Sequence, residues 1–153
     1  MKDKYYIDSL PYEIELTARI CHESARKMVE SYTNEITIDE FTVLDTIIAR
    51  PNLSQADLAR LILKGKAHTG RFLMSLEDKG FIERHVEERD GKLIKVSSVT
   101  TEGLALYNDI VKSMKPSIKM FESVISENEV MNIISNLKKF RAAIDKVWDI
   151  AFE

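Results

Sequence analysis

Hydrophobic residues recur every three or four positions along both ends of the chain, which is the spacing of an amphipathic helix. In the first flank, roughly residues 11–32, this stripe consists of Ile7, Leu10, Ile14, Ala18, Cys21, Ala25, Met28 and Tyr32. In the last flank it consists of Val130, Ile133, Ile134, Leu137, Phe140, Ile144, Val147 and Trp148. All five glycines lie between residues 65 and 103. The pattern therefore predicts helical flanks around a centre that contains the tight turns.

Helix-start signals divide the stretch that follows the first flank. In "TIDEF", Thr37 is a candidate N-cap and Glu40 stands three residues later, which is a capping box. We expect this helix to continue to about Ala49 and to end before Pro51. A second capping residue, Ser54, then begins another helix.

Two short helices and a turn are predicted next. The helix that begins after Ser54, in "SQAD", should reach about Leu63, and "KGK" then forms a turn. The following helix should run from about Lys66 to Lys79, with Gly80 as its C-terminal cap.

A β-hairpin interrupts the helices. In "FIERHVEERDGKLIKVSSVT", β-branched residues stand on both sides of Asp90 and Gly91, and Asp-Gly is a strong signal for a two-residue hairpin turn. Helical spacing resumes in "TTEGLALYNDIVKSM", and we expect Pro116 to bend or break that helix. Ser126 and Glu129 form another capping box that begins the last helix.

The predicted order is thus four helices, a hairpin and two helices, and its middle part, from about 37 to 101, has the order of a winged helix-turn-helix. The fold class expected is mainly α with a small β-hairpin wing. Charge supports a polyanion partner for that part, because local charge, not the global sum of −3, decides where a polyanion docks. Residues 50–75 have a net charge of +4, from Arg50, Arg60, Lys64, Lys66 and Arg71 against Asp57.

Composition excludes several classes of protein. No apolar run approaches the roughly 20 residues that a membrane span needs, and the N-terminus has no apolar stretch of signal-peptide length. The one cysteine, Cys21, excludes an internal disulfide and a cysteine-based zinc cluster. A cytoplasmic location is the expectation. We expect no cofactor.

The helix from about Lys66 carries the candidate function. On a helical wheel, the residues that point inward are Thr69, Phe72, Leu73 and Leu76. The residues that point outward in the first two turns are small or cationic, among them Ala67, Gly70 and Arg71. A helix that enters the major groove needs this arrangement. Gly70 costs about 1 kcal/mol relative to alanine within a helix, which suggests close approach by another group. The alternative is an ordinary surface helix with a solvated charged face.

The hairpin tip adds cations next to this helix. Arg89 and Lys92 flank the turn, and Lys95 lies on the outgoing strand. Such a tip suits a wing that contacts the phosphate backbone or the minor groove. The alternative is that hairpin tips are commonly charged because they are exposed to water.

Three motifs in this order, "LSQADLA", "LEDKGFIER" and "VTTEG", resemble the multiple antibiotic resistance regulator (MarR) family of bacterial transcription factors. The resemblance spans about 70 residues. It implies a homodimer that binds double-stranded DNA at a near-palindromic operator, most often as a repressor that a ligand releases. Residues 36–101 would be the DNA-binding domain, whereas residues 1–35 and 102–153 would form the dimerisation arm. The apolar surface of the last helix agrees with that arm.

The resemblance also implies roles for individual residues. Facing the groove would be Lys66, Ala67, His68, Gly70 and Arg71. Ser54 and Gln55 would hold phosphates at a helix N-terminus, Arg89 and Lys92 would form the wing, and Lys64 lies in the basic turn. The chain departs from the family in "KAHTGR", where hydroxyl residues are frequent at Ala67, His68 and Gly70. It also has Leu93 where the family often has a second wing arginine. Base preference is therefore not transferred.

Other candidate sites carry alternatives. Some members of the family sense peroxides through a cysteine, but Cys21 is expected to be a small core residue. The family often binds small aromatic or phenolic effectors, and the residues that could line such a site are Tyr5, Tyr6, Tyr12, His22, Arg26 and Tyr32, although packing explains each equally well. The ligand-binding residues are otherwise unknown.

Enzyme activity is not expected. The three histidines, His22, His68 and His85, have no metal-binding spacing, and no nucleophile elbow, phosphate loop or dinucleotide fingerprint is present. The main alternative to a regulator is a winged-helix interaction module that has lost DNA binding. A Cys21-based redox sensor is the third hypothesis.

Overall fold

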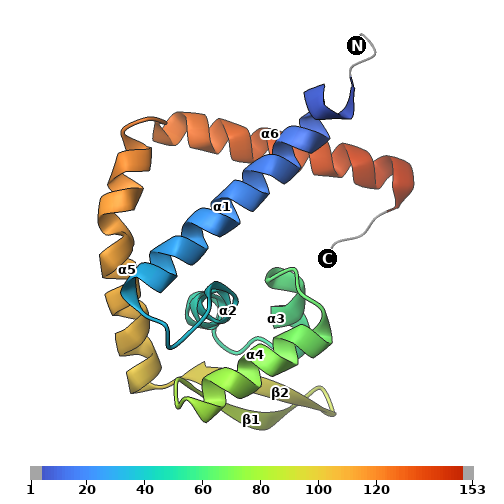
Figure 1. Ribbon diagram of the computed structural model, residues 1–153. Coiled ribbons are helices and arrows are strands. Elements are labelled where there is room, and N and C mark those ends of the chain that lie inside the picture. The colour runs from blue at the N-terminus through green and yellow to red at the C-terminus, as the bar shows by residue number, and fades with distance from the viewer. Residues whose placement is uncertain (1–4, 150–153) are drawn as a thin grey trace.

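The computed structural model describes residues 5–149, and Figure 1 shows the arrangement of its helices and strands. In chain order they are the 3-10 turn η1 (Tyr6–Asp8), α1 (Leu10–Tyr32), α2 (Ile38–Ala49), α3 (Gln55–Leu61), α4 (Lys66–Asp78), β1 (Ile82–Arg89), β2 (Lys92–Val99), α5 (Thr101–Glu122) and α6 (Glu127–Trp148). The predicted order and fold class, mainly α with one small hairpin, are confirmed.

The chain has two structural parts. Helices α2, α3 and α4 and the hairpin gather at one end, while α1, α5 and α6 extend away from them as an arm (Figure 1). The core lies at the first end, and its fully buried large side chains include Leu44, Leu58, Leu73 and Ile82. Val29 of α1 and Ile110 of α5 are fully buried in the same core, so both helices are anchored in it.

The capping signals in the sequence form as predicted. Thr37 and Glu40 make a reciprocal capping box at α2, and Ser126 does the same with Glu129 at α6. The hairpin turn has positive φ at both Asp90 (52°) and Gly91 (73°). This geometry matches the right-handed twist of the strands, which explains the Asp-Gly pair.

The structure corrects two predicted helix ends. Helix α3 ends at Leu61, and Leu63 has a φ of 57° in the left-handed region, so the helix stops about two residues earlier than expected. Of the two effects predicted for Pro116, a bend or a break, the break does not occur, because α5 continues through this residue to Glu122. Proline frees the carbonyl four residues earlier. That carbonyl belongs to Lys112, which is exposed and can be solvated by water.

The carboxylate of Glu40 links α2 to the end of α4. Only 4% of Glu40 is exposed. Its carboxylate accepts a hydrogen bond from the Thr37 backbone N–H at 2.7 Å and from Lys79 Nζ at 2.8 Å. Burial by itself raises the pKa of Glu40, but hydrogen bonds from Lys79, Ser75 and Thr37 outweigh burial, and the net pKa is lowered. A charged carboxylate with these partners is tolerated inside the protein.

The apolar stripes of both flanks stay exposed in a single chain. Helix α6 has no buried residue and makes at most marginal contact with other described elements. The exposed apolar side chains of α6 are Val130, Met131, Ile133, Ile134, Ile144, Val147 and Trp148. Cys21 on α1 is exposed as well, which contradicts its prediction as a buried core residue. The reason is that α1 buries only Val29 within this chain.

Candidate nucleic-acid interface

Helix α4 separates an apolar face from a cationic face, as its sequence predicts. Thr69, Leu73 and Leu76 are completely buried, and Phe72 packs half-buried against the same core. On the opposite side the exposed residues are Lys66, Ala67, His68, Arg71 and Met74. Since the inner face is held by the core, the outer face has a defined orientation toward anything that docks there.

Two cations on this face are available to a ligand. Among residues 5–149, neither Lys66 nor Arg71 has a side-chain ion pair or hydrogen bond. An Arg or Lys without an internal partner can bind a guanine edge or a phosphate without first losing a contact. The first turn of α4 begins after Gly65, which caps the helix without a side-chain bond.

Lys64 differs from these two cations. Its Nζ lies 3.0 Å from Asp39 Oδ1 at the start of α2. The pair joins the turn between α3 and α4 to α2, so part of the positive charge counted from the sequence is neutralised within the chain. A DNA contact by Lys64 stays a prediction, and it would compete with Asp39.

The hydroxyl of Ser54 is used by its own helix. It accepts a hydrogen bond from the Asp57 backbone N–H at 3.1 Å and donates one to Asp57 Oδ2 at 2.5 Å. This second bond is the main reason why the pKa of Asp57 is lowered, and Arg60 lowers it further. The predicted phosphate contact of Ser54 would have to replace or share these bonds.

Gly70 lies beneath the side chain of Gln55, the first residue of α3. A Cβ atom at residue 70 would stand 3.3 Å from Gln55 Nε2. The sequence suggested close approach at Gly70, and the approaching group is the protein's own glutamine. The Gln55 amide therefore lies against α4 at Gly70. Sequence reasoning missed this contact because it joins two helices, and no local signal reports it.

The two predicted wing cations, Arg89 and Lys92, differ in their contacts within the protein. Lys92 is exposed and has no side-chain partner among the described residues. Arg89 is fully engaged: its Nε and Nη2 bind Glu87 Oε2, at 3.2 and 2.8 Å, and its Nη1 donates to the Asn52 carbonyl at 2.8 Å. The hydrogen bond from Arg89, followed by that from His85, lowers the pKa of Glu87. Only Lys92 is free at the tip in this state.

The predicted effector residues do not come together in one place. The Tyr6 hydroxyl donates to Glu15 at 2.7 Å, and the Tyr6 and Tyr12 rings make an edge contact at 5.6 Å. The guanidinium of Arg26 binds Glu23 and Glu30. Two residues of the prediction, Tyr5 and His22, are exposed. Tyr32 lies at the far end of α1, where desolvation and then the nearby Asp109 raise the pKa of its phenol. Tyr12 and Tyr32 are 20 residues apart on α1, which is about 30 Å along the helix axis.

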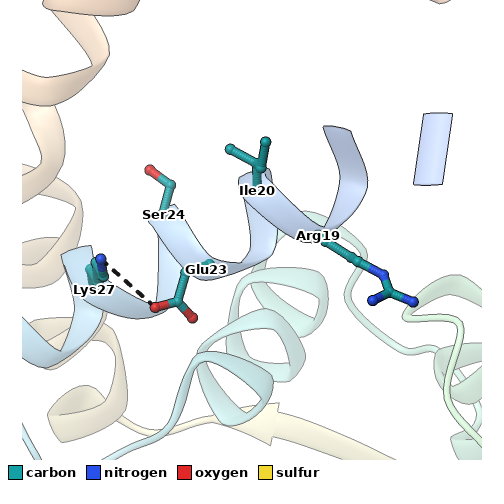
Figure 2. A pocket seen from close by; sticks show the side chains of 5 residues that line it. All are labelled: Arg19, Ile20, Glu23, Ser24 and Lys27. Carbon is teal, nitrogen blue, oxygen red and sulfur yellow. Dashed lines mark ion pairs between the residues drawn. The ribbon is translucent and has the colours of Figure 1, made fainter. Parts of the chain in front are cut away.

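Two hollows lie along α1. One, of about 500 Å³, is lined by Arg19, Ile20, Glu23, Ser24 and Lys27, and Figure 2 shows these side chains projecting from this single helix. The other, of about 200 Å³, is lined by Tyr6, Tyr12, Glu15, Leu16 and Arg19. Because one helix lines each of them almost alone, a second surface is needed to enclose a ligand.

Within the described part of the chain, no three His, Cys, Asp or Glu side chains are grouped so that they could hold a metal ion. None of the described helices is both long enough and apolar enough to cross a membrane.

The arrangement of α2, α3 and α4 with a two-stranded wing, joined to a helical arm, defines a winged helix-turn-helix protein. Residues 36–94 match the model of the MarR family. For these residues the resemblance carried by the sequence motifs is confirmed. A search of curated proteins finds no match.

Solved structures share the fold over almost the whole chain. The Staphylococcus aureus MepR–DNA complex is 22% identical, with a TM-score of 0.74, and the match covers 92% of this chain and 99% of that chain. PcaV from Streptomyces coelicolor, solved with its natural ligand, is 15% identical with a TM-score of 0.69, covering 93% and 99%. The regulator SlyA is 23% identical with a TM-score of 0.71, covering 92% and 97%.

Proposed function

We propose that this protein binds a near-palindromic operator as a homodimer and acts as a repressor that a small ligand releases. The observation that carries the proposal is the exposed face of α4, where Lys66 and Arg71 have no side-chain partner among the described residues while the opposite face packs into the core. This face fits the major groove, and the free Lys92 fits the adjacent phosphate backbone. The cytoplasm is the location that such a role requires.

The exposed apolar arm supports a second copy of the chain as partner. An apolar surface of this extent on α6 favours association over exposure to water. Helices α1 and α5 would complete the interface, with residues 1–35 and 102–153 as the dimerisation arm and 36–101 as the DNA-binding unit. Because a two-fold symmetric dimer carries two α4 helices, its natural target is a near-palindrome.

A small aromatic or phenolic effector fits the same arrangement. The hollows on α1 combine aromatic rings and the Ile20 side chain with the cationic groups of Arg19 and Lys27. In a dimer a second surface could enclose them, and occupancy there would shift the arm relative to the DNA-binding unit. The solved PcaV structure contains its natural ligand, which shows that a protein of this fold can accommodate one.

Fluorescence anisotropy tests the proposal. DNA from upstream of the protein's own gene is compared with an unrelated duplex of equal length at several salt concentrations. We expect tight binding to the upstream DNA with a steep salt dependence. The variant Arg71→Ala should lose about 1–3 kcal/mol of binding free energy and relax the sequence preference. Lys112→Ala, an exposed lysine on α5, is the matched control.

The proposal fails if no DNA is bound even at low salt. That outcome would favour the winged-helix interaction module instead. One observation supports this second candidate: several cations near the interface are paired with carboxylates of the chain, as Lys64 is with Asp39 and Arg84 with Glu77. Such pairing reduces the positive field that attracts a polyanion.

A redox-sensing variant of the regulator rests on Cys21. Its thiol is exposed in the single chain, as an oxidation-sensitive cysteine must be. If Cys21 senses peroxide, Cys21→Ser abolishes the release of DNA by peroxide, whereas an unchanged response excludes this role.

A further inference from the structure

The wing is attached to the segment before α3 at two points. Ser54 pairs with Val96 of β2 through an isolated antiparallel bridge. Nearer the tip, Arg89 Nη1 donates to the Asn52 carbonyl at 2.8 Å. Asn52 itself has a φ of 67°, in the left-handed region, so the carbonyl that Arg89 binds is presented by a special turn.

The side chains around Arg89 form a chain of contacts along one face of β1. Every second side chain of a strand points to the same face, so the side chains of residues 85, 87 and 89 share one face of β1. His85 Nε2 lies 2.8 Å from Glu87 Oε1, and the other oxygen of Glu87 binds Nε and Nη2 of Arg89. Every nitrogen of the Arg89 guanidinium thus has an acceptor within the protein.

Across the hairpin, Arg89 stands opposite Lys92 in the strand register. Both side chains are exposed, that of Arg89 to 40%, but they differ in their contacts: Arg89 is bound on two sides, whereas Lys92 has no partner among the described residues. Arg89 is therefore fixed by hydrogen bonds to Glu87 and Asn52, whereas Lys92 is available to a ligand.

We propose that Arg89 is a positioning residue: with Glu87 as its orienting partner, it fixes the wing on the loop before α3 and so places Lys92 for its phosphate contact. Arg89 does not itself bind DNA. The planar guanidinium suits this role, since it bonds a carboxylate and a carbonyl in two directions at once, which an ammonium group cannot reproduce. The inference rests on the proposed DNA binding, and it replaces the expectation that both wing cations contact DNA.

The first test compares Arg89→Lys with Lys92→Ala by anisotropy on the operator DNA. Arg89→Lys keeps the charge and loses the two-sided geometry. We expect it to weaken specific binding about fivefold, as much as Lys92→Ala does. The double variant should be no weaker than Lys92→Ala alone, because Arg89 acts through Lys92. If Arg89→Lys binds like the wild type while Arg89→Gln lowers the salt slope by about one, Arg89 contacts phosphate directly and the inference is wrong.

A second comparison uses neighbouring glutamates. Glu87→Gln and Glu88→Gln remove the same charge from adjacent residues, but Glu88 points to the opposite face and is exposed. We expect Glu87→Gln to bind DNA more weakly than Glu88→Gln. Stronger binding by Glu87→Gln would mean that Glu87 only competes with DNA for Arg89, and would overturn the positioning role.

A third measurement does not depend on DNA. Hydrogen exchange of the hairpin amides should be faster in Arg89→Lys and Glu87→Gln than in the wild type and Glu88→Gln. Equal exchange in all four proteins would refute the attachment. If the wild type binds no DNA but the exchange differs as expected, the proposed function fails and the attachment of the wing stands.

Discussion

Replacing Lys79 by methionine tests whether the buried Glu40 carboxylate holds α2 against the end of α4. The variant keeps the length of the side chain and removes the donor that lies 2.8 Å from Glu40 Oε1. Glu40 is 4% exposed and retains its bond from the Thr37 N–H, so the carboxylate loses one of its partners but not all of them.

The magnitude follows from this geometry. A hydrogen bond to a charged group contributes about 1.5–3 kcal/mol. The side chain of Lys79 is 35% exposed, so water replaces part of the lost contact and the lower half of that range applies. We expect Lys79→Met to lower the free energy of unfolding by about 1.5–2 kcal/mol at pH 7.

The pH dependence gives the sharper test. The pKa of Glu40 is lowered in the folded protein, so its contribution to stability is fully present above the unfolded value of about 4.5 and is lost as the pH falls through the folded pKa. The difference between wild type and Lys79→Met should therefore shrink as the pH falls below about 4.5.

Urea unfolding followed by circular dichroism, at a fixed protein concentration and at several pH values between 7 and 3, measures this difference. Lys95→Met is the matched control, because Lys95 is an exposed lysine with no side-chain partner among the described residues. A difference between Lys79→Met and the wild type that stays constant over the whole pH range would refute the role assigned to Glu40.

Three further predictions concern single residues. Gly70→Ala should keep or raise the melting temperature, since alanine favours a helix by about 1 kcal/mol. The same variant should weaken specific DNA binding several-fold, because the added Cβ displaces the Gln55 side chain. An unchanged affinity would mean that Gln55 has no role in DNA binding. Leu63→Gly should stabilise the protein by about 0.5–1 kcal/mol in urea unfolding, because it relieves a left-handed leucine that is 78% exposed. Tyr107→Phe should cost about 1 kcal/mol through loss of the 2.8 Å bond to Asp45, and an ultraviolet titration of the wild type should show a phenol with a pKa of about 12.

Local signals in the sequence predicted most of the fold. Both capping boxes act within four residues, and the Asp-Gly turn acts within two, so the chain needs no distant partner to form them. The inward face of α4 was predicted equally well, because a helical period of 3.6 residues specifies which side chains share a face. The same helical period predicted that Lys66 and Arg71 are exposed.

The errors and omissions have a common origin in long-range contacts. Cys21 fits an apolar stripe, but whether that stripe is covered depends on which element, or which second chain, packs on it. Pro116 is compatible with a helix wherever the freed carbonyl can be solvated, which the sequence around it does not reveal. Arg89 and Lys92 are both cations at a hairpin tip, and no local pattern shows that Arg89 is bound by Glu87 and by the Asn52 carbonyl.

The sequence by itself determined the order of the elements, the helix boundaries within a few residues, and the face of α4 that is presented outward, because each depends on interactions between near neighbours. Only the tertiary structure decided which of these residues are free to bind. It placed the Asn52 carbonyl beside Arg89 and the Gln55 amide over Gly70, and it joined Lys79 to Glu40. Partners separated by 15 to 39 residues come into contact only when the core brings their helices and strands together, and the pattern of a single segment does not predict such contacts.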